Sequence, residues 1–161
     1  MKTQPSIPCP IGRAVGVLGE RWTLLILRNA NLGMTRFDAF RAELGIADNI
    51  LANRLARLVE AGLLVRVPYR DGGRTRQEYR LTAAGADVLP VLRALAVWGQ
   101  EHTEPYEPTE PMQVIHLLCG QATAPGDICG HCGQPIRRTE EAWLRPWRSD
   151  EPYPLAEPVR P

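Results

Sequence analysis

Four side chains in the last third of the chain have the types and the spacing of a metal site. They form the pattern His-x2-Cys-x9-Cys-x2-Cys at His116, Cys119, Cys129 and Cys132. Two intervening residues allow a tight turn to present both of its side chains to one ion, and three thiolates with one imidazole form a closed tetrahedral set. We therefore expect a structural Zn²⁺ site here, not a catalytic one.

The cluster leaves two alternatives open. Cys129 and Cys132 alone could form a redox dithiol or share this spacing by chance. His131 could replace His116 as the imidazole ligand, although its side chain should diverge from those of its immediate neighbours. Acidic neighbours disfavour contact with phosphate, so we expect the metal to shape a small appendage; these neighbours are Glu110, Asp127, Glu140 and Glu141.

Cys9 stands apart from this cluster, just before the first expected helix. A thiol near a helix N-terminus can have a lowered pKa and react with oxidants or electrophiles. A free cysteine can equally be a small buried hydrophobic residue. The sequence leaves both roles open, so Cys9 is a candidate redox sensor.

The composition suits one main folded domain with an appendage, since the chain has 161 residues of which 44% are hydrophobic. Residues 1–102 carry 14 basic and 9 acidic side chains, whereas residues 103–161 carry 5 and 9. The basic part favours an anionic partner. We find no signal peptide and no apolar run long enough to cross a bilayer, so we expect a cytoplasmic protein without membrane contact. In that compartment cysteines favour metal or redox chemistry over disulfides.

Hydrophobic periodicity predicts helices over residues 11–30 and 48–61, with a short helix between them. Thr35 is a candidate cap for the short helix. Asp48 is the expected N-cap of the second long helix, because Ala47 has no side chain that could cap it.

Two strand-like runs follow at residues 64–69 and 77–81, and the Asp-Gly step between them predicts a β-hairpin. A last long helix is expected over residues 82–102. Pro90 should kink this helix, because it removes one backbone hydrogen bond.

The expected elements follow the order of a winged helix-turn-helix: a short helix, a turn, a helix, a hairpin and a long helix. In this fold the second helix enters the major groove of DNA. We expect Asn49, Asn53 and Arg54 to read base edges from the face opposite the leucine stripe. Arg57 is better placed for a phosphate. The basic hairpin tip can lie on the DNA backbone or in the minor groove, through Arg70, Arg74 and Arg76. Each surface alone could be merely solvated, but their order favours DNA binding.

Several segments of the first two-thirds match a known pattern. They are Cys-Pro-Ile at 9–11, Gly-Glu-Arg-Trp-Thr-Leu-Leu-Ile-Leu at 19–27, Arg-Phe-Asp at 36–38, Gly-Ile at 45–46, Glu-Ala-Gly-Leu-Leu at 60–64 and Glu-Tyr-Arg-Leu-Thr at 78–82, with Leu51, Arg54, Leu55 and Leu58. With these segments the chain resembles the HxlR-type regulators, which are MarR-like winged helix-turn-helix proteins.

The resemblance implies a homodimer that represses or activates nearby promoters. In this family the first and last helices form the dimer, here residues 11–30 and 82–102. The resemblance also implies a cysteine sensor at the position of Cys9 in some members and a C-terminal knuckle in others. Ala47 and residues 74–76 depart from the family pattern, which leaves the preferred DNA sequence open.

We therefore expect an α+β fold, mainly α, divided into four parts. Residues 1–102 form the winged helix-turn-helix domain with its long C-terminal dimerisation helix, and residues 103–112 form a Glu-Pro linker. Residues 113–143 form a small zinc-bound β-hairpin appendage. Residues 144–161 form a proline-rich tail, expected to be irregular and partly mobile.

The expected function is sequence-specific binding of double-stranded operator DNA by a transcription regulator, acting as a repressor. No paired carboxylates, phosphate loop or nucleophile triad indicates an enzyme. The main alternative is a winged-helix protein-interaction adaptor with a structural zinc knuckle. A small molecule or an oxidant is the expected class of signal; Trp22 and Trp98 could line a pocket for a ligand between the dimer helices, although both also fit a core.

Overall fold

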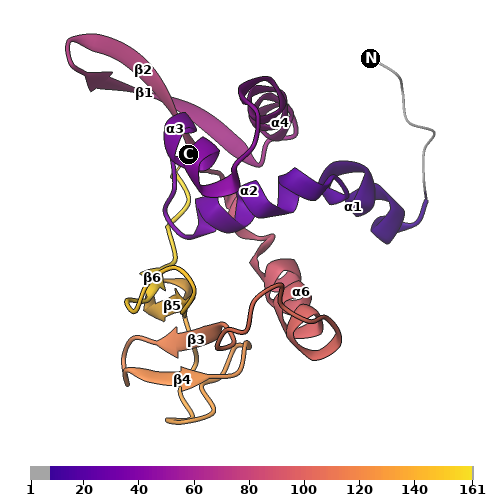
Figure 1. The fold of residues 1–161 in the computed structure, drawn as a ribbon, viewed down its shortest axis with the longest axis vertical. Coiled ribbons are helices and arrows are strands. Elements are labelled where there is room, and N and C mark those ends of the chain that lie inside the picture. Colours follow the sequence, from indigo (N-terminus) through magenta and orange to yellow (C-terminus); the bar gives the residue numbers. More distant parts are fainter. Residues whose placement is uncertain (1–7, 161) are drawn as a thin grey trace.

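The computed structural model describes residues 8–160 of the chain. The fold is α+β, mainly α, with a long hairpin at one end and a small sheet at the other (Figure 1). In chain order the elements are α1 (Pro10–Leu18), α2 (Arg21–Asn31), α3 (Phe37–Leu44), α4 (Asp48–Glu60), β1 (Leu64–Asp71), β2 (Arg74–Leu81), α5 (Ala83–Ala86), α6 (Leu89–His102), β3 (Gln113–His116), β4 (Gln121–Thr123), the 3₁₀ turn η1 (Arg138–Glu140), β5 (Glu141–Leu144) and β6 (Tyr153–Pro154).

The centre of the winged helix is an apolar cluster shared by α2, α3 and α4. Its fully buried members include Ile26, Phe40, Leu51 and Leu55. Burying each such side chain contributes about 1.5–3 kcal/mol. The leucine stripe of α4 thus faces this core, as predicted, and fixes which side of α4 remains at the surface.

The hairpin is longer than predicted and turns at a different pair of residues. Gly72 and Gly73, with φ of 54° and 82°, form the two-residue turn. Two consecutive positive φ values are those of a type I′ turn, which suits the twist of antiparallel strands. Residues before α3 extend this sheet, since the Tyr79 N–H donates to the Thr35 carbonyl oxygen at 2.7 Å.

Two of the three predicted long helices are divided in the structure, whereas the helix predicted over residues 48–61 is present as α4. The first expected helix, 11–30, is broken at Gly19, the C-cap of α1, so that α1 and α2 are separate. The last, 82–102, is divided into α5 and α6. Pro90 lies in the first turn of α6, where its missing N–H breaks no helical hydrogen bond, so it begins a helix and does not kink one.

Two of the predicted helix caps are wrong. Ala47 occupies the N-cap position of α4 without a side-chain hydrogen bond, and Asp48 is the first residue of the helix. The Asp48 carboxylate lies 3.3 Å from Arg41, while it still places negative charge at the helix N-terminus. Thr35 lies before the N-cap of α3, and its hydroxyl donates to Glu78 at 3.0 Å.

The C-terminal third forms a four-stranded antiparallel sheet in the order β4-β3-β5-β6, and not only a hairpin. Its proline-rich end packs back onto the winged helix. Leu155 is buried, the Ala156 N–H donates to the Asn31 carbonyl at 2.7 Å, and the Val159 N–H donates to the Leu81 carbonyl at 2.8 Å. The prediction of a partly mobile tail did not foresee these contacts, because the residues that the tail contacts are distant in the sequence.

One apolar core runs through both parts of the molecule. Val114, Trp143 and Leu155 belong to the same buried cluster as Ile26 and Leu92. The small sheet is therefore built onto the winged helix through side-chain packing. Within residues 8–160, no helix has both the length and the apolar character needed to span a membrane.

Gly85 marks a close approach that the fold requires. A Cβ at this position would overlap the carbonyl oxygen of Leu63 and lie 3.1 Å from Leu81 Cδ2. We expect Gly85→Ala to lower the free energy of unfolding by about 1–3 kcal/mol, because backbone atoms must move. Urea denaturation of the full chain measures this change.

Gly99→Ala in α6 is the matched control. There a Cβ would meet only Thr103 Oγ1, at 4.0 Å. Alanine should leave the stability unchanged or raise it by up to about 1 kcal/mol, because it restricts the unfolded chain. Equal effects of the two variants would contradict the close contact.

Candidate functional site

The four predicted metal ligands come together in the C-terminal sheet. Their ligand atoms all lie within 4.8 Å of one another. His116 Nδ1 lies 3.5 Å from Cys119 Sγ and 3.3 Å from Cys132 Sγ, and the Cys119 and Cys129 sulfurs are 3.8 Å apart. Tetrahedral zinc, with Zn–S of about 2.3 Å and Zn–N of about 2.0 Å, separates neighbouring ligand atoms by about 3.5–3.8 Å. The cluster could therefore hold a metal ion, and it uses His116 and not His131.

Two similar backbone turns present these ligands. The Gly120 N–H donates to the His116 carbonyl at 2.8 Å, and the Gly133 N–H donates to the Cys129 carbonyl at 2.9 Å. Both glycines have positive φ, 69° and 72°, a conformation that a side chain would disfavour. Each pair of ligands is thus followed by a glycine that closes its turn.

The surroundings favour the metal-binding thiolate at Cys129 but not at Cys119. The Gln121 backbone hydrogen bond lowers the pKa of Cys119, but burial and the hydrogen bonds with Cys129 and Cys132 outweigh it and raise this pKa. The backbone N–H groups of Cys132 and His131 donate to the Cys129 sulfur and lower the pKa of this thiol to about 6. The thiolate is the form that binds metal. His116 is fully buried, and its Nε2 has no hydrogen-bond partner in the part of the chain that the structure describes. Glu140 Oε2 lies 4.0 Å from that nitrogen, on the side where ligating histidines usually have a carboxylate or carbonyl.

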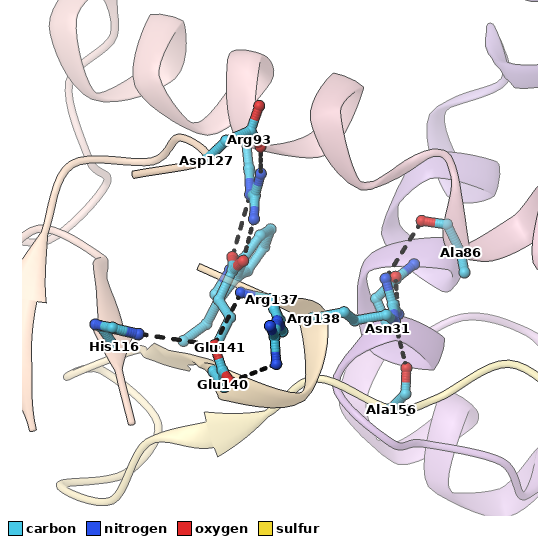
Figure 2. A network of polar contacts seen from close by, with 11 residues as sticks. Asn31, Ala86, Arg93, His116, Asp127, Arg137, Arg138, Glu140, Glu141 and Ala156 are labelled. Carbon is cyan, nitrogen blue, oxygen red and sulfur yellow. Dashed lines mark hydrogen bonds and ion pairs between the residues drawn. The ribbon is translucent and has the colours of Figure 1, made fainter. Parts of the chain in front are cut away.

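Figure 2 shows how the segment beside the cluster reaches the winged helix. Glu141 is fully buried, and its carboxylate accepts hydrogen bonds from Arg93 of α6 and from Trp143 Nε1. Arg138 donates at 2.6 Å to Asn31 Oδ1 and also bonds the carbonyls of Ala86 and Ala156. The turn that carries Glu140 is therefore fixed to α2, α5 and α6.

The exposed side of α4 carries three of the four predicted DNA-binding residues of this helix. Asn49, Asn53 and Arg57 are exposed. Arg54 is largely buried, because its guanidinium pairs with Glu20 at 2.9 Å, at the start of α2. The structure thus brings Asn49, Asn53 and Arg57 to one surface and holds Arg54 away from it.

The hairpin separates the three predicted basic residues of its tip. In the strand register Arg70 is opposite Thr75, and Asp71 is opposite Arg74, so that Arg74 and Arg76 lie on one face and Arg70 on the other. Arg76 lies 3.4 Å from Asp71 and 3.6 Å from Asp38. Acidic residues therefore partly neutralise Arg76, whereas Arg74 has no ion pair within residues 8–160.

Sequence reasoning missed two basic residues beside the tip. Arg36 stacks over the Tyr69 ring, with Cζ 4.7 Å from its centroid. Arg66 is exposed on β1, on the same face as Arg70. For Arg66 the signal was its spacing from Arg70, since residues four apart on a strand lie on one side. Arg36 had no such signal, because its partner Tyr69 is distant in sequence.

Apolar side chains are exposed on the first and last helices of the winged helix. No residue of α1 is buried, and Ile11 and Val15 are 73% and 60% exposed. On α6, Leu95 and Trp98 are 46% and 58% exposed. Cys9 is exposed at the N-cap of α1, so the described chain does not hold it as a buried hydrophobic residue.

Residues 17–107 match the model of the HxlR-like helix-turn-helix family. The chain belongs to this family. A helix-turn-helix transcriptional regulator of Mycobacterium tuberculosis is 45% identical over 126 residues, or 78% of each chain. This alignment is longer than the family match, so part of it lies outside the helix-turn-helix.

Solved structures agree with this assignment. One is the crystal structure of PA1607, a proposed transcription factor, whose sequence is 36% identical to that of this HxlR-like protein. The two structures superpose with a TM-score of 0.67, over 82% of this chain and 91% of PA1607. Another is the redox regulator HypR in its oxidized form, which is 26% identical in sequence. It superposes with a TM-score of 0.55, over 60% of the HxlR-like protein and the whole HypR chain. The protein is thus a transcriptional regulator of a DNA-binding helix-turn-helix family, and not an enzyme.

The pair of Arg93 and Glu141 provides a test of how the metal cluster is attached. Arg93→Met leaves the Glu141 carboxylate buried without its main partner, and breaking such a pair costs about 3–5 kcal/mol. We expect a loss of this size in the free energy of unfolding, measured by urea denaturation. The double variant Arg93→Met/Glu141→Gln should recover part of the loss, because it removes the buried charge.

Arg41→Met is the control, since among residues 8–160 Arg41 pairs only with the exposed Asp38 and Asp48. Its cost should be below about 1 kcal/mol. A similar cost for Arg93→Met and Arg41→Met would show that the Glu141 pair does not hold the sheet.

Proposed function

We propose that this HxlR-like regulator binds operator DNA sequence-specifically as a homodimer and represses adjacent promoters. The observation that carries the proposal is the exposed polar side of α4 beside the arginine-bearing β1–β2 hairpin. The major groove is about 12 Å wide and accommodates one such helix. The hairpin then lies on the DNA backbone or in the neighbouring minor groove.

The exposed side chains of α4 contact different parts of the DNA. Asn53 and Asn49 read base edges, since an Asn amide pairs bidentately with adenine. Arg57, nearer the C-terminal end of the helix, contacts phosphate. Arg54 reads a base only after its ion pair with Glu20 opens; in the described conformation it holds α4 against the start of α2.

The dimer forms through α1 and α6. Their exposed apolar side chains, among them Ile11, Val15, Leu95 and Trp98, are those that a second copy would cover. A two-fold dimer of this kind presents two α4 helices to half-sites about 34 Å apart, one turn of the DNA. The operator is then a pseudo-palindrome.

We also infer that a structural Zn²⁺ is bound by His116, Cys119, Cys129 and Cys132 in the appendage formed by residues 113–143. The ligand-atom distances support this assignment, as does His116 Nδ1, which lies 3.5 Å and 3.3 Å from the Cys119 and Cys132 sulfurs. Four protein ligands leave no open position, so the ion would supply stability and not catalysis. The small sheet gains from such a staple because its own core is small.

An oxidant is the signal that Cys9 favours. Its thiol is exposed beside the apolar face of α1, where oxidation or alkylation would disturb dimer contacts. The likeness to HypR, a redox regulator, supports this role. The mechanism requires no change at the metal cluster.

Specific recognition is tested by binding to DNA selected from a random pool, followed by fluorescence anisotropy at fixed salt. Asn53→Ala should weaken operator binding by about tenfold and change binding to random DNA little, because a base contact is worth about 1–3 kcal/mol. Replacing Arg74 and Arg76 by Gln should reduce the salt slope by about one per lost phosphate contact.

Arg137→Gln is the matched control, because Arg137 is 80% exposed and lies in the appendage. It should leave both the affinity and the salt slope unchanged. If the wild-type protein selects no sequence and its binding has no salt dependence, the interaction adaptor replaces the DNA-binding regulator.

Zinc is tested on the purified full chain by metal analysis and thermal unfolding. We expect about one zinc per chain, and Cys132→Ser should lose the metal and lower Tm by several degrees. Cys9→Ser, which removes a thiol outside the cluster, should keep both. A structural zinc would be contradicted if the wild-type protein contains no metal and its three cluster thiols react freely. An unchanged Tm in Cys132→Ser would contradict it as well.

A further inference from the structure

A large hollow lies where the winged helix, the linker and the C-terminal sheet meet. Its volume is about 960 Å³, at the upper end of the range for small-molecule sites. Leu24 of α2 and Leu92 and Ala96 of α6 form one wall, and Trp143 and Trp147 form another. Figure 1 shows the chain leaving α6 and returning to β3 along this side of the molecule. The hollow is therefore mainly apolar. Of its two tryptophans only Trp147, which is 48% exposed, offers its ring for contact, because Trp143 is 1% exposed.

Two arginines also line this apolar hollow. Arg28 and Arg145 share one carboxylate, Glu43, which lies 3.8 Å from Arg28 and 3.2 Å from Arg145. Arg148 takes part in the same group, 3.3 Å from Glu43. Three guanidinium groups with one carboxylate leave an excess of positive charge. Arg145 is buried, whereas the Arg28 and Arg148 side chains are 26% and 44% exposed. Such an excess is stable only where further negative charge or polar contact offsets it.

In the described part of the chain, besides Glu43, only neutral groups compensate the charge of the two lining arginines: Arg145 stacks over the Tyr153 ring at 4.9 Å, and Arg28 Nε donates to Asn29 Oδ1 at 3.0 Å. Burial, followed by the nearby charge of Arg145, lowers the pKa of Arg28 to about 10. The Nε of Arg145, a residue only 4% exposed, has no hydrogen-bond partner among residues 8–160. An unpartnered buried donor costs about 1–3 kcal/mol, which an incoming acceptor would recover.

We propose that this hollow binds a small organic anion, with an apolar aromatic body against Trp147 and a carboxylate between Arg28 and Arg145. Guanidinium groups bind carboxylates through charge-assisted hydrogen bonds, and the apolar walls exclude competing water. The walls come from α2, α6 and the C-terminal sheet, so the ligand joins the two parts of the molecule. This proposal goes beyond DNA binding and does not depend on it.

Two other sources of negative charge fit less well. Glu107 and Glu110 of the linker also border the hollow, but within residues 8–160 neither forms an ion pair with Arg28 or Arg145. The apolar helix α1 of a second copy has no acidic residue, so it cannot neutralise the arginines. A separate anion is therefore the occupant that the charges favour.

Isothermal titration calorimetry of the full chain, without DNA, tests the proposal with naphthoate as the probe and naphthamide as its neutral counterpart. We expect naphthoate to bind about tenfold more tightly, the effect of one charge-assisted contact. Arg28→Gln should abolish this preference while Glu43 keeps Arg145 and Arg148. Trp147→Ala should weaken both compounds, because it removes part of the apolar wall.

Arg74→Gln on the β1–β2 hairpin is the control and should keep the preference, since it removes the same charge far from the hollow. Arg28→Lys keeps the charge and should retain part of the preference, which separates the site from a folding defect. The proposal is wrong if neither compound binds, if acid and amide bind equally, or if Arg28→Gln leaves their ratio unchanged. It is also wrong if naphthoate binds only after Glu107 and Glu110 are replaced by Gln. That result would mean that the linker carboxylates occupy the site in the wild-type protein. None of these results bears on operator binding.

Discussion

The buried carboxylate of Glu141 sets the arrangement of the two parts of this regulator. A charge removed from water persists only where partners surround it. Here Arg93 of α6 and the indole of Trp143 provide those partners. Because Glu141 begins β5 and follows Glu140, which lies beside His116, one ion pair fixes the sheet, the cluster and α6 together.

This constraint gives α6 two different faces. One face packs toward α2 and the C-terminal sheet, where Leu92 is buried and Arg93 is engaged. The other exposes Leu95 and Trp98. A helix held on one side by the appendage and offered on the other to a second copy can transmit a change between them. That geometry gives the C-terminal sheet a role in shaping the proposed dimer.

The surface proposed to bind DNA depends on a different set of contacts. The leucine stripe fixes the orientation of α4, and the ion pair between Arg54 and Glu20 fixes its distance from the start of α2. At the hairpin, Asp38 and Asp71 hold Arg76 in place. Acidic residues thus position some arginines and leave others, such as Arg74, available for a phosphate.

The sequence alone determined what depends on near neighbours in the chain. Periodicity placed the core face of α4, the short spacings indicated the four side chains that cluster at residues 116–132, and the order of the elements indicated the winged helix. The tertiary structure decided what depends on distant partners: the break at Gly19, the burial of Arg54, the packing of Leu155 and the charge excess around Glu43. A helical or cysteine pattern repeats within a few residues and is visible in one window. An ion pair such as Arg145 with Glu43 joins residues about a hundred positions apart, and only the folded chain brings them together.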